Sequence, residues 1–468
     1  MNLGRTRRIH FVGIGGIGMS GIAELLANLG YEVSGSDLRR SEVTARLVSS
    51  FGVTIHEGHA AANIGEADVV VVSSAVRASN PEVVEAGRRG IPVIARAEML
   101  AELMRMRFSI AVAGAHGKTT TASMIAFVLE QGGLDPDAVI GGRLRAFGSS
   151  ARLGRGEYMV AEADESDRSF LALWPSVVVV TNIDREHMES YGSMDDLQQA
   201  FVDFANKVPF YGAVIACADD PLLSQVLPRV RRRLVTYGLD NPAAHLSAVR
   251  VELGAYGGRC VVRRRRQNAV ETLGAMELSV PGRHNLQNAL AAAAVGAEVG
   301  LEFAQVARAL RAFEGAERRF ERHGEAAGVA VVDDYAHHPT EIAAVLAAAR
   351  TTLDGRLIVA FQPHRYTRTR ELMADFGPAL RDADEVVLTD IYAAGEDPIP
   401  GITIEQLADA IRRGSGRPVR LVHRLEDLVP ELLKTVRAGD AVITLGAGSI
   451  GTVPKQLLEA LEHKEAGA

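Results

Sequence analysis

The chain has 468 residues, of which 47% are hydrophobic and 23% are charged, and its formal net charge is −7. This length and composition predict a globular protein of several α/β domains. The negative charge argues against a nucleic-acid or anionic-lipid partner, and no apolar run reaches the roughly 20 residues that cross a bilayer. Cys217 and Cys260 form no Cys-x-x-Cys motif, so we expect two idle thiols in a reducing cytoplasm.

Residues 1–106 predict a Rossmann-like unit in which parallel strands alternate with helices. RRIHFVGIGG, YEVSGSD and ADVVVVSSAV each read as a strand, and MSGIAELLANLG reads as a helix after the first strand. Gly13, Gly15 and Gly18 fit Gly-x-Gly-x-x-Gly, and Asp37 ends the next strand. Such a loop attracts a diphosphate, which NAD and a nucleotide sugar both carry. A structural turn without a ligand is the alternative.

Residues 107–315 predict a central domain that binds ATP. FSIAVAGAHGKTTT reads as a strand, a glycine loop and the start of a helix at about Thr120. A P-loop would have its opening glycine at Val112, and the glycine comes two residues later, at Gly114. Lys118 can still reach the β- and γ-phosphates, and Thr119 can ligate Mg²⁺. A chance match is the alternative, but only five lysines occur in the chain, so one at this position favours a P-loop.

Polar residues follow two further strands of this segment. Glu162, Asp164, Glu165 and Asp167 end EYMVAEADESD, and Asp184, Glu186 and His187 end SVVVVTNIDREHM. Because ligands gather at the carboxyl ends of parallel strands, these groups could hold the metal of a Mg²⁺–ATP site. A solvated acidic loop is the alternative.

The remaining part of this segment differs in pattern. Residues 249–280 alternate and predict a small antiparallel insert, whereas 282–300 predict a helix. The runs Arg231–Arg233 and Arg263–Arg266 carry few aromatic neighbours, so we interpret them as solvated faces rather than nucleic-acid contacts.

Residues 316–468 predict a third α/β unit with four apolar strands. Asp333, Asp334, Tyr335, His337 and His338 follow the first strand. His364, Arg365, Arg368 and Arg370 follow the second. Two arginines three residues apart suit bidentate capture of a carboxylate or phosphate, and a surface salt-bridge cluster is the alternative.

The motifs GAHGKTTT, AEADESD, TNIDREHM, GRHNLQNALAA, RRF and DDYAHHPTE occur in the order found in the Mur ligases, which the chain therefore resembles. Mur ligases are ATP-dependent, amide-forming enzymes of peptidoglycan synthesis, and their P-loop lacks the early glycine. The resemblance implies three α/β domains: a Rossmann-like UDP-sugar-binding domain (1–106), a central P-loop ATPase-like domain with a small antiparallel insert (107–315) and a C-terminal Rossmann-like, amino-acid-binding domain (316–468).

GIGGIGMSG, DDYAHHPTE and FQPHRYTRT are most similar to the family members that join L-alanine to UDP-N-acetylmuramate. The resemblance implies ATP and Mg²⁺ as cofactors, an acyl-phosphate intermediate, domain closure on the substrates and a cytoplasmic enzyme without a nucleic-acid or membrane partner. The oligomeric state stays open. The alternatives are a ligase that recycles murein peptides, an NAD(P)-dependent oxidoreductase and a P-loop protein that only hydrolyses ATP.

The resemblance also implies roles for individual residues. For the UDP-sugar these are Gly13, Gly15, Gly16, Ile17, Gly18, Met19, Asp37, Ser73 and Ser74. For ATP they are Gly114, Ala115, His116, Gly117, Lys118, Thr119, Thr120, Asn285, Asn288, Arg319, Asp333 and Asp334. For the amino acid they are Tyr335, His337, Arg365 and Arg368. Metal ligands are Thr119, Glu162 and His187, and the catalytic residues are Lys118, Glu162, His187 and His337.

One feature departs from the family. Several Mur ligases carry a carbamylated lysine about 15 residues beyond the metal-binding histidine, but no lysine lies between His187 and Lys207 here. We therefore predict no carbamate, and what replaces its charge stays open.

Overall fold

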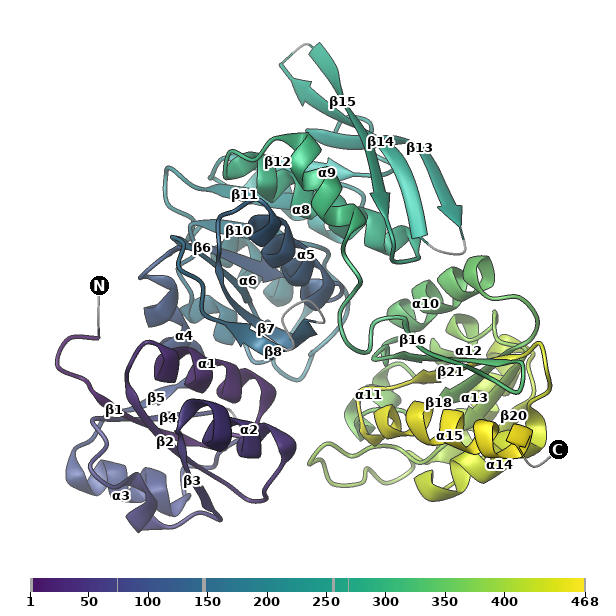
Figure 1. The fold of residues 1–468 in the computed structure, drawn as a ribbon, viewed down its shortest axis with the longest axis horizontal. Helices are drawn as coiled ribbons and strands as arrows, with labels where there is room; N and C mark the ends of the chain where they lie inside the picture. Colours follow the sequence, from purple (N-terminus) through teal and green to yellow (C-terminus); the bar gives the residue numbers. More distant parts are fainter. Residues whose placement is uncertain (1–2, 74, 145–148, 255–256, 268, 467–468) are drawn as a thin grey trace. The chain divides into compact units, whose positions relative to one another are not determined.

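The computed structural model describes residues 3–466 except 74, 145–148, 255–256 and 268 (Figure 1). The chain divides into two compact units. Unit 1 comprises Met1–Arg250, Cys260–Met276 and Gln287–Glu314, and unit 2 comprises Val251–Arg259, Glu277–Leu286 and Gly315–Ala468. Among the described residues, no helix is long and apolar enough to cross a membrane.

The N-terminal sheet of unit 1 has five parallel strands in the order β3-β2-β1-β4-β5. The strands are β1 (Arg8–Val12), β2 (Glu32–Asp37), β3 (Thr54–Glu57), β4 (Val69–Val72) and β5 (Val93–Ala95). The helices are α1 (Ile17–Asn28), α2 (Glu42–Phe51), α3 (Pro81–Arg89) and α4 (Arg96–Met104). The strand order reverses between β1 and β4, and ligands bind outside the carboxyl ends of strands at such a switch point. The glycine loop follows β1 directly.

The second sheet has ten strands in the order β15-β14-β13-β12-β11-β10-β6-β9-β7-β8. They are β6 (Phe108–Ala113), β7 (Asp137–Leu144), β8 (Ser149–Arg152), β9 (Tyr158–Glu162), β10 (Val177–Val180), β11 (Ala213–Cys217), β12 (Leu234–Gly238), β13 (Leu246–Gly254), β14 (Gly257–Arg266) and β15 (Ala269–Leu278). The associated helices are α5 (Lys118–Gln131), α6 (Met194–Ala205), α7 (Pro221–Val226), α8 (Arg283–Glu298) and α9 (Phe303–Arg311).

Two features of this sheet bear on function. β10, β6 and β9 are parallel neighbours, so the P-loop after β6 lies at the same edge as the acidic segments after β9 and β10. The predicted insert consists of β13, β14 and β15, which extend the same sheet beyond β12. Because only two residues connect each of these strands to the next, neighbouring strands of the insert run antiparallel.

The sheet of unit 2 has six strands in the order β16-β17-β21-β18-β19-β20. They are β16 (Glu321–Ala326), β17 (Val329–Asp334), β18 (Leu357–Phe361), β19 (Glu385–Leu388), β20 (Val419–Leu421) and β21 (Ala441–Leu445). The helices are α10 (Pro339–Thr352), α11 (Tyr366–Glu371), α12 (Phe376–Ala379), α13 (Ile404–Ser415), α14 (Leu428–Thr435) and α15 (Val453–Ala466). Only β16 is antiparallel to its neighbour.

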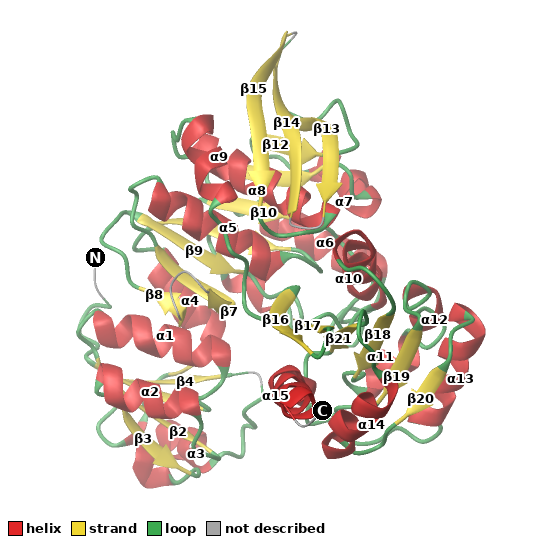
Figure 2. Ribbon diagram, turned by 45° about the vertical axis from the view of Figure 1, so that its right-hand side comes forward, coloured by secondary structure: helices red, strands yellow, loops and turns green. Residues whose placement is uncertain are grey.

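Helices cover both faces of this sheet (Figure 2). One core contains Leu346 of α10, Phe376 of α12 and Leu407 of α13, and the other contains Leu432 of α14 and Leu457 of α15. Because both faces are covered, β18 is apolar and buried along its whole length, as is usual in parallel sheets. Its carboxyl end leads directly into the predicted His and Arg cluster.

Candidate functional site

The glycine loop after β1 is fastened to the end of β2. The N–H groups of Gly13 and Ile14 donate to the Ser36 carbonyl over 2.8 and 3.0 Å. The Gly15 N–H donates to Oδ2 of Asp37 over 2.8 Å. A Cβ atom at Gly15 would lie 2.8 Å from that carboxylate oxygen, so a larger residue would displace the Asp37 side chain. Asp37, the predicted ribose contact, therefore also closes the loop itself.

The helix that follows begins at Ile17 with Gly16 as its N-cap. Because Gly16 has no side chain, the first-turn N–H groups of α1 receive no side-chain oxygen from the N-cap, which suits an anionic ligand. A Cβ atom at Gly18 would lie 2.6 Å from the guanidinium of Arg96, and Met19 is buried. Ser73, a predicted contact of the UDP-sugar, directly follows β4. Its carbonyl accepts the Val76 N–H over 3.1 Å. Ser74 lies outside the described residues.

A cavity of about 650 Å³ opens beside Asp37. Its lining includes Arg39 and Arg40, which follow β2, and His56 and Glu57, which end β3. These groups offer hydrogen-bond donors and acceptors beside the loop that would bind a diphosphate. The sequence did not identify this cavity, because β3 has only four residues and no strong apolar pattern.

The P-loop between β6 and α5 requires both of its glycines. Gly114 has φ +133°, and a Cβ atom there would lie 2.1 Å from the Thr181 hydroxyl. Gly117 has φ +80°, and its Cβ atom would lie 2.9 Å from Oδ1 of Asn288. The His116 N–H donates to Oδ1 of Asn182 over 2.8 Å, which ties the loop to the segment after β10. The predicted ATP residues Asn288 and Gly117 are therefore neighbours.

Lys118 begins α5, two residues before the predicted helix start, and its ammonium group lies inside the loop. Nζ donates to the carbonyl of Gly114 over 2.6 Å and to Oε1 of Glu165 over 2.8 Å. The side chain of Lys118 is 17% exposed and that of Glu165 only 3% exposed. Burial alone would lower the pKa of Lys118, but the carboxylates of Glu165 and Asp164 raise it, so the ammonium stays charged. Thr119 and Thr120, which follow, are buried.

An acidic cluster lies next to this lysine. Glu165, Glu186 and His187 each offer a ligand atom, and these atoms lie within 4.8 Å of one another. Oε2 of Glu165 is buried and has no hydrogen-bond partner among the described residues, and burial raises the pKa of this carboxyl. Glu162, the predicted ligand on β9, accepts the Gly141 N–H at Oε1 over 2.9 Å. Carboxylate oxygens with one imidazole form a donor set that suits a divalent cation.

Lys207, the first lysine after His187, has its own partners. Its ammonium group donates to the Leu171 carbonyl and lies 4.5 Å from the centre of the Trp174 ring. These contacts engage Lys207 with Leu171 and Trp174.

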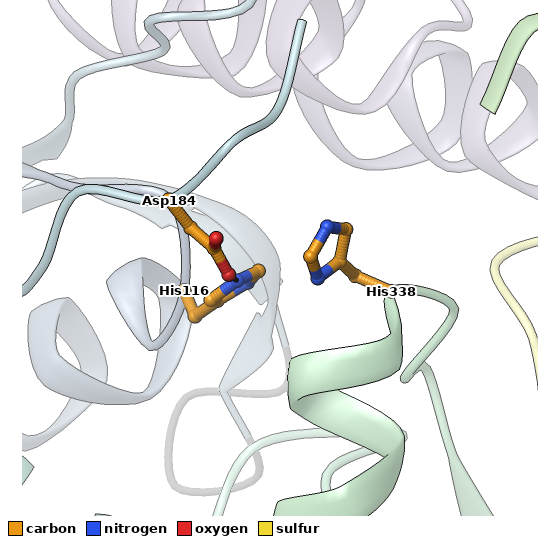
Figure 3. Close-up of side chains that lie close together, drawn as sticks. All are labelled: His116, Asp184 and His338. Atoms are coloured by element: carbon orange, nitrogen blue, oxygen red, sulfur yellow. Dashed lines mark hydrogen bonds and ion pairs between the residues drawn. The ribbon is translucent and has the colours of Figure 1, made fainter. Parts of the chain in front are cut away.

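His116 of the P-loop pairs with Asp184, which follows β10 (Figure 3). Nε2 of His116 lies 2.7 Å from Oδ2 of Asp184. His338, also drawn in Figure 3, belongs to unit 2. His116 was among the predicted ATP residues, whereas Asp184 was recognised only as part of a polar strand end. The pair adds a hydrogen bond between the P-loop and the strand next to it.

In unit 2, the two aspartates that end β17 have different surroundings. Asp333 accepts from Nε of Arg318 over 2.6 Å and from the Thr444 hydroxyl over 2.5 Å. Asp334 accepts the N–H groups of Phe320 and Ala336, each over 2.7 Å. Burial raises the pKa of Asp334 to about 6. Both carboxylates therefore serve the fold, in addition to the predicted contact with ATP.

The predicted ATP residues Asn285 and Arg319 also have protein contacts in unit 2. Nδ2 of Asn285 donates to the Pro281 carbonyl over 2.6 Å. The guanidinium of Arg319 lies 5.2 Å from the centre of the Tyr335 ring, and its Nη1 lies 3.8 Å from Oε1 of Glu341.

The predicted amino-acid residues of unit 2 are brought together around His364. The His337 ring lies 5.5 Å from the Tyr335 ring and 5.3 Å from the His364 ring. Nη1 of Arg368 lies 3.0 Å from Nδ1 of His364. Arg365, the N-cap of α11, has φ +69°, an uncommon backbone conformation for a residue other than glycine. The geometry therefore groups aromatic, imidazole and guanidinium side chains at the carboxyl ends of β17 and β18.

Two residues at this cluster were missed from sequence. The Tyr392 ring stacks 5.7 Å from the His364 ring, and Oε2 of Glu341 lies 3.6 Å from Nδ1 of His337. Tyr392 comes from a loop after β19 and carries no motif. Glu341 lies in the first turn of α10, where an acidic residue also reads simply as a helix cap.

Comparison with known proteins covers the whole chain. Three family models match: "Mur ligase family, catalytic domain" at residues 8–108, "Mur ligase middle domain" at 112–296 and "Mur ligase, glutamate ligase domain" at 318–448. A UDP-N-acetylmuramate–L-alanine ligase of Anaeromyxobacter dehalogenans is 55% identical, with 99% of this chain and 100% of the relative covered. An enzyme of the same name from Syntrophus aciditrophicus is 53% identical, with 98% and 95% covered.

Solved structures agree with this relationship. A UDP-N-acetylmuramate-alanine ligase from Thermotoga maritima superimposes with a TM-score of 0.82 at 30% identity, covering 98% of this chain and 99% of that one. A murein peptide ligase from Psychrobacter arcticus superimposes with a TM-score of 0.72 at 26% identity, covering 97% and 99%. The fold, the P-loop and the full-length similarity agree, and the chain belongs to the Mur ligase family.

Proposed function

We propose that this chain joins L-alanine to the lactyl carboxylate of UDP-N-acetylmuramate, with conversion of ATP to ADP and phosphate. The observation that carries the proposal is the 55% identity over 99% of the chain to a ligase with that name. The reaction is a cytoplasmic step of peptidoglycan synthesis, because both the nucleotide-linked sugar and ATP are cytoplasmic compounds. The oligomeric state stays open.

The glycine loop after β1 binds the diphosphate of the nucleotide sugar in this proposal. The N-terminus of α1 supports this role, because its N–H groups and partial positive charge favour an anion. The cavity beside Asp37 would take the uridine end, with Arg39, Arg40 and His56 as hydrogen-bonding groups. Gly13, Gly15 and Gly18 allow the backbone to approach the ligand closely.

The P-loop of unit 1 binds the ATP phosphates in this proposal. Lys118 supports the role because its ammonium is buried, charged and held by carbonyls of its own loop. A divalent cation fits the acids beside it, because Oε2 of Glu165 is buried and has no hydrogen-bond partner in the part of the chain that the structure describes. Thr119, Glu162 and His187 would hold Mg²⁺ ions, with Glu165 and Glu186 close to His187. Bound Mg²⁺ would neutralise charge on the phosphates.

The cluster around His364 receives L-alanine in this proposal. Arg365 and Arg368 bind the carboxylate of the amino acid, because a guanidinium can donate two parallel hydrogen bonds to it. Tyr335 borders the methyl group. His337 takes a proton from the ammonium of L-alanine, a role supported by the Glu341 carboxylate 3.6 Å from its ring.

The chemistry has two steps. An oxygen of the lactyl carboxylate attacks the γ-phosphorus of ATP, so that ADP leaves and an acyl phosphate forms. Lys118 stabilises the charge that develops on the transferred phosphoryl group. The amine that His337 has deprotonated then attacks the acyl carbon, and the tetrahedral intermediate collapses with cleavage of the bond to phosphate, which leaves with the second proton of the former ammonium.

The murein-peptide recycling ligase and the oxidoreductase are not favoured. The relatives with 52–55% identity carry the alanine-adding name, and all three family models describe Mur ligases. The test is phosphate release with ATP, Mg²⁺ and UDP-N-acetylmuramate, with either L-alanine or a murein tripeptide added. Release that requires both the nucleotide sugar and L-alanine supports the proposal. Release with the tripeptide alone, or without any acceptor, contradicts it.

A further inference from the structure

A buried polar network lies beneath the glycine loop of the N-terminal sheet and is not used by the chemistry above. Its centre is Glu82 on the first turn of α3, whose side chain is fully buried. The Ser36 hydroxyl donates to Oε2 of Glu82 over 2.6 Å, and the Asn63 amide donates to Oε1 over 2.6 Å. His10 on β1 is also fully buried, with Nε2 3.7 Å from Oε2 of Glu82.

The carboxylate of Glu82 is ionised inside the protein. Burial alone would raise its pKa, but the nearby His10 ring and the hydrogen bonds from Ser36 and Asn63 lower it to about 2. The first turn of α3 adds a favourable helix dipole. A buried charge is costly unless its geometry is well satisfied, and replacing such a group with apolar residues is often neutral for stability. Stability alone therefore gives no strong reason for an ionised glutamate at this position.

The hydrogen bonds of Ser36 determine which ring nitrogen of His59 carries a proton. The Ser36 hydroxyl has one hydrogen, which it donates to Glu82. Nδ1 of His59 lies 2.9 Å from the same hydroxyl oxygen and must therefore be the donor in that contact. Glu82 thus fixes both Ser36 and the ring of His59, and the His59 side chain is 19% exposed.

The network is connected directly to the candidate sugar site. The backbone carbonyl of Ser36 accepts the N–H groups of Gly13 and Ile14, while its hydroxyl is held by Glu82. The next residue, Asp37, holds the Gly15 N–H and lines the cavity. Glu82 is thus connected to the glycine loop through Ser36 of β2, whose neighbour in the chain is Asp37.

We infer that Glu82 is a positioning residue for the nucleotide sugar, acting through Ser36 and Asp37 to hold the glycine loop in its binding conformation. The identity of the sugar rests on the proposed function. The binding of a nucleotide diphosphate is argued from the glycine loop itself. Loss of the charge should let the end of β2 shift, and small displacements of a binding loop are costly to affinity.

The test compares the full-length wild type with Glu82→Gln and Ser36→Ala. Binding of UDP is measured by titration calorimetry, and KM and kcat are measured for each substrate. We expect each variant to weaken UDP binding and raise the KM for UDP-N-acetylmuramate about tenfold. The values of kcat and of the KM for ATP and L-alanine should stay within about twofold. The double variant should bind UDP no more weakly than the more impaired of the two single variants, because both changes break the same connection between Glu82 and Ser36.

Asp137→Asn is the matched control, because Asp137 is another buried carboxylate, which pairs with Arg107 over 2.8 Å and accepts the Gly154 N–H over 2.8 Å instead of an N–H of the glycine loop. Asp137→Asn should lower the melting temperature but should not selectively raise the KM for UDP-N-acetylmuramate. Ser36→Ala keeps the test open if Glu82→Gln does not fold. Unchanged UDP binding in folded Glu82→Gln or Ser36→Ala overturns the inference. An equal rise in the KM values of all three substrates also overturns it. A wild type that binds UDP but forms no amide would overturn the proposed function and leave this inference standing.

Discussion

Two glycine loops in unit 1 occupy the same place in their sheets and are stabilised by opposite charges. The loop after β1 is closed by the carboxylate of Asp37, and residues 13–19 contain no basic side chain. The loop after β6 instead encloses the ammonium of Lys118, which also donates to the carboxylate of Glu165. Both loops offer backbone N–H groups at a helix N-terminus.

The difference separates binding from phosphoryl transfer. A diphosphate that is only bound needs donors and a close backbone approach, which glycines supply. A phosphoryl group that is transferred gains charge that a fixed cation must stabilise. The presence of Lys118 and the nearby acids in only one loop therefore indicates where the chemistry takes place. Four experiments test or refine this distinction.

Loss of the ammonium should have the largest effect. Lys118→Ala should reduce kcat about 10³-fold, because the transferred charge loses its fixed partner. Lys118→Arg should also be strongly impaired, because a planar guanidinium does not fit among the loop carbonyls. The measurement is phosphate release with circular dichroism as the folding check. Lys455→Ala, whose side chain is 81% exposed, is the control and should retain activity. Wild-type turnover in Lys118→Ala would remove the distinction between the loops.

Alanine at one glycine of each loop should give the next largest difference between the loops. Gly114→Ala places Cβ 2.1 Å from the Thr181 hydroxyl at a φ of +133°, whereas Gly15→Ala meets two side chains, Oδ2 of Asp37 at 2.8 Å and Cγ2 of Thr44 at 3.2 Å. We expect a loss of about 3 kcal/mol in the free energy of unfolding for Gly114→Ala and about 1 kcal/mol for Gly15→Ala. Urea denaturation measures both. Equal losses would mean that the P-loop is no more constrained than the first loop.

Metal dependence should belong to the second loop alone. Removal of Mg²⁺ with EDTA should abolish phosphate release and leave UDP binding unchanged. His187→Asn should raise the Mg²⁺ concentration for half-maximal rate about tenfold. Asparagine is chosen because His187 has φ +58°, which asparagine tolerates. Glu102→Gln, at a side chain that is 43% exposed and pairs with Arg105, is the control and should respond to Mg²⁺ as the wild type does. An unchanged requirement in His187→Asn would exclude this residue as a ligand.

The smallest effect concerns Asp334 of unit 2, whose folded pKa is about 6 against an ordinary value of 3.8. A raised folded pKa means that the neutral form stabilises the fold; this contribution is complete below pH 3.8 and lost as the pH rises through about 6. Between pH 5 and 7.5 the wild type should lose about 1 kcal/mol of unfolding free energy relative to Asp334→Asn. Urea titrations at both pH values measure this difference. A difference of the opposite sign would contradict the burial effect.

The sequence predicted the strands that lead into the site, and the reason is visible in their burial. β6, β10, β18 and β21 are largely buried and apolar, and a polar residue or a glycine follows each directly. β3, β5 and β20 were missed because they have three or four residues and only partial burial. β16 was missed because ERHGEA is charged and pairs only at the edge of its sheet. β11 (Ala213–Cys217) was also missed although it is buried along its whole length, so apolar patterning reveals many of the core strands but not all of them.

The site was predicted less completely than the fold. The family motifs indicated Lys118 and His187, because each of these residues lies within a short continuous motif. Glu165 lies three residues beyond Glu162, and spacing alone does not tell which carboxylate turns toward Lys118. The contacts of Glu82 with Ser36 and His10 join segments 46 residues or more apart, so only the folded chain reveals them.

The central claim is that a carboxylate of the sugar bound by the first loop is phosphorylated at the second. It is tested most directly with UDP-N-acetylmuramate carrying ¹⁸O in both lactyl carboxylate oxygens, ATP, Mg²⁺ and L-alanine. The account predicts that the released phosphate contains one ¹⁸O atom and that the amide product keeps the other. Unlabelled phosphate, with or without amide formation, would show that no acyl phosphate forms and would contradict the account.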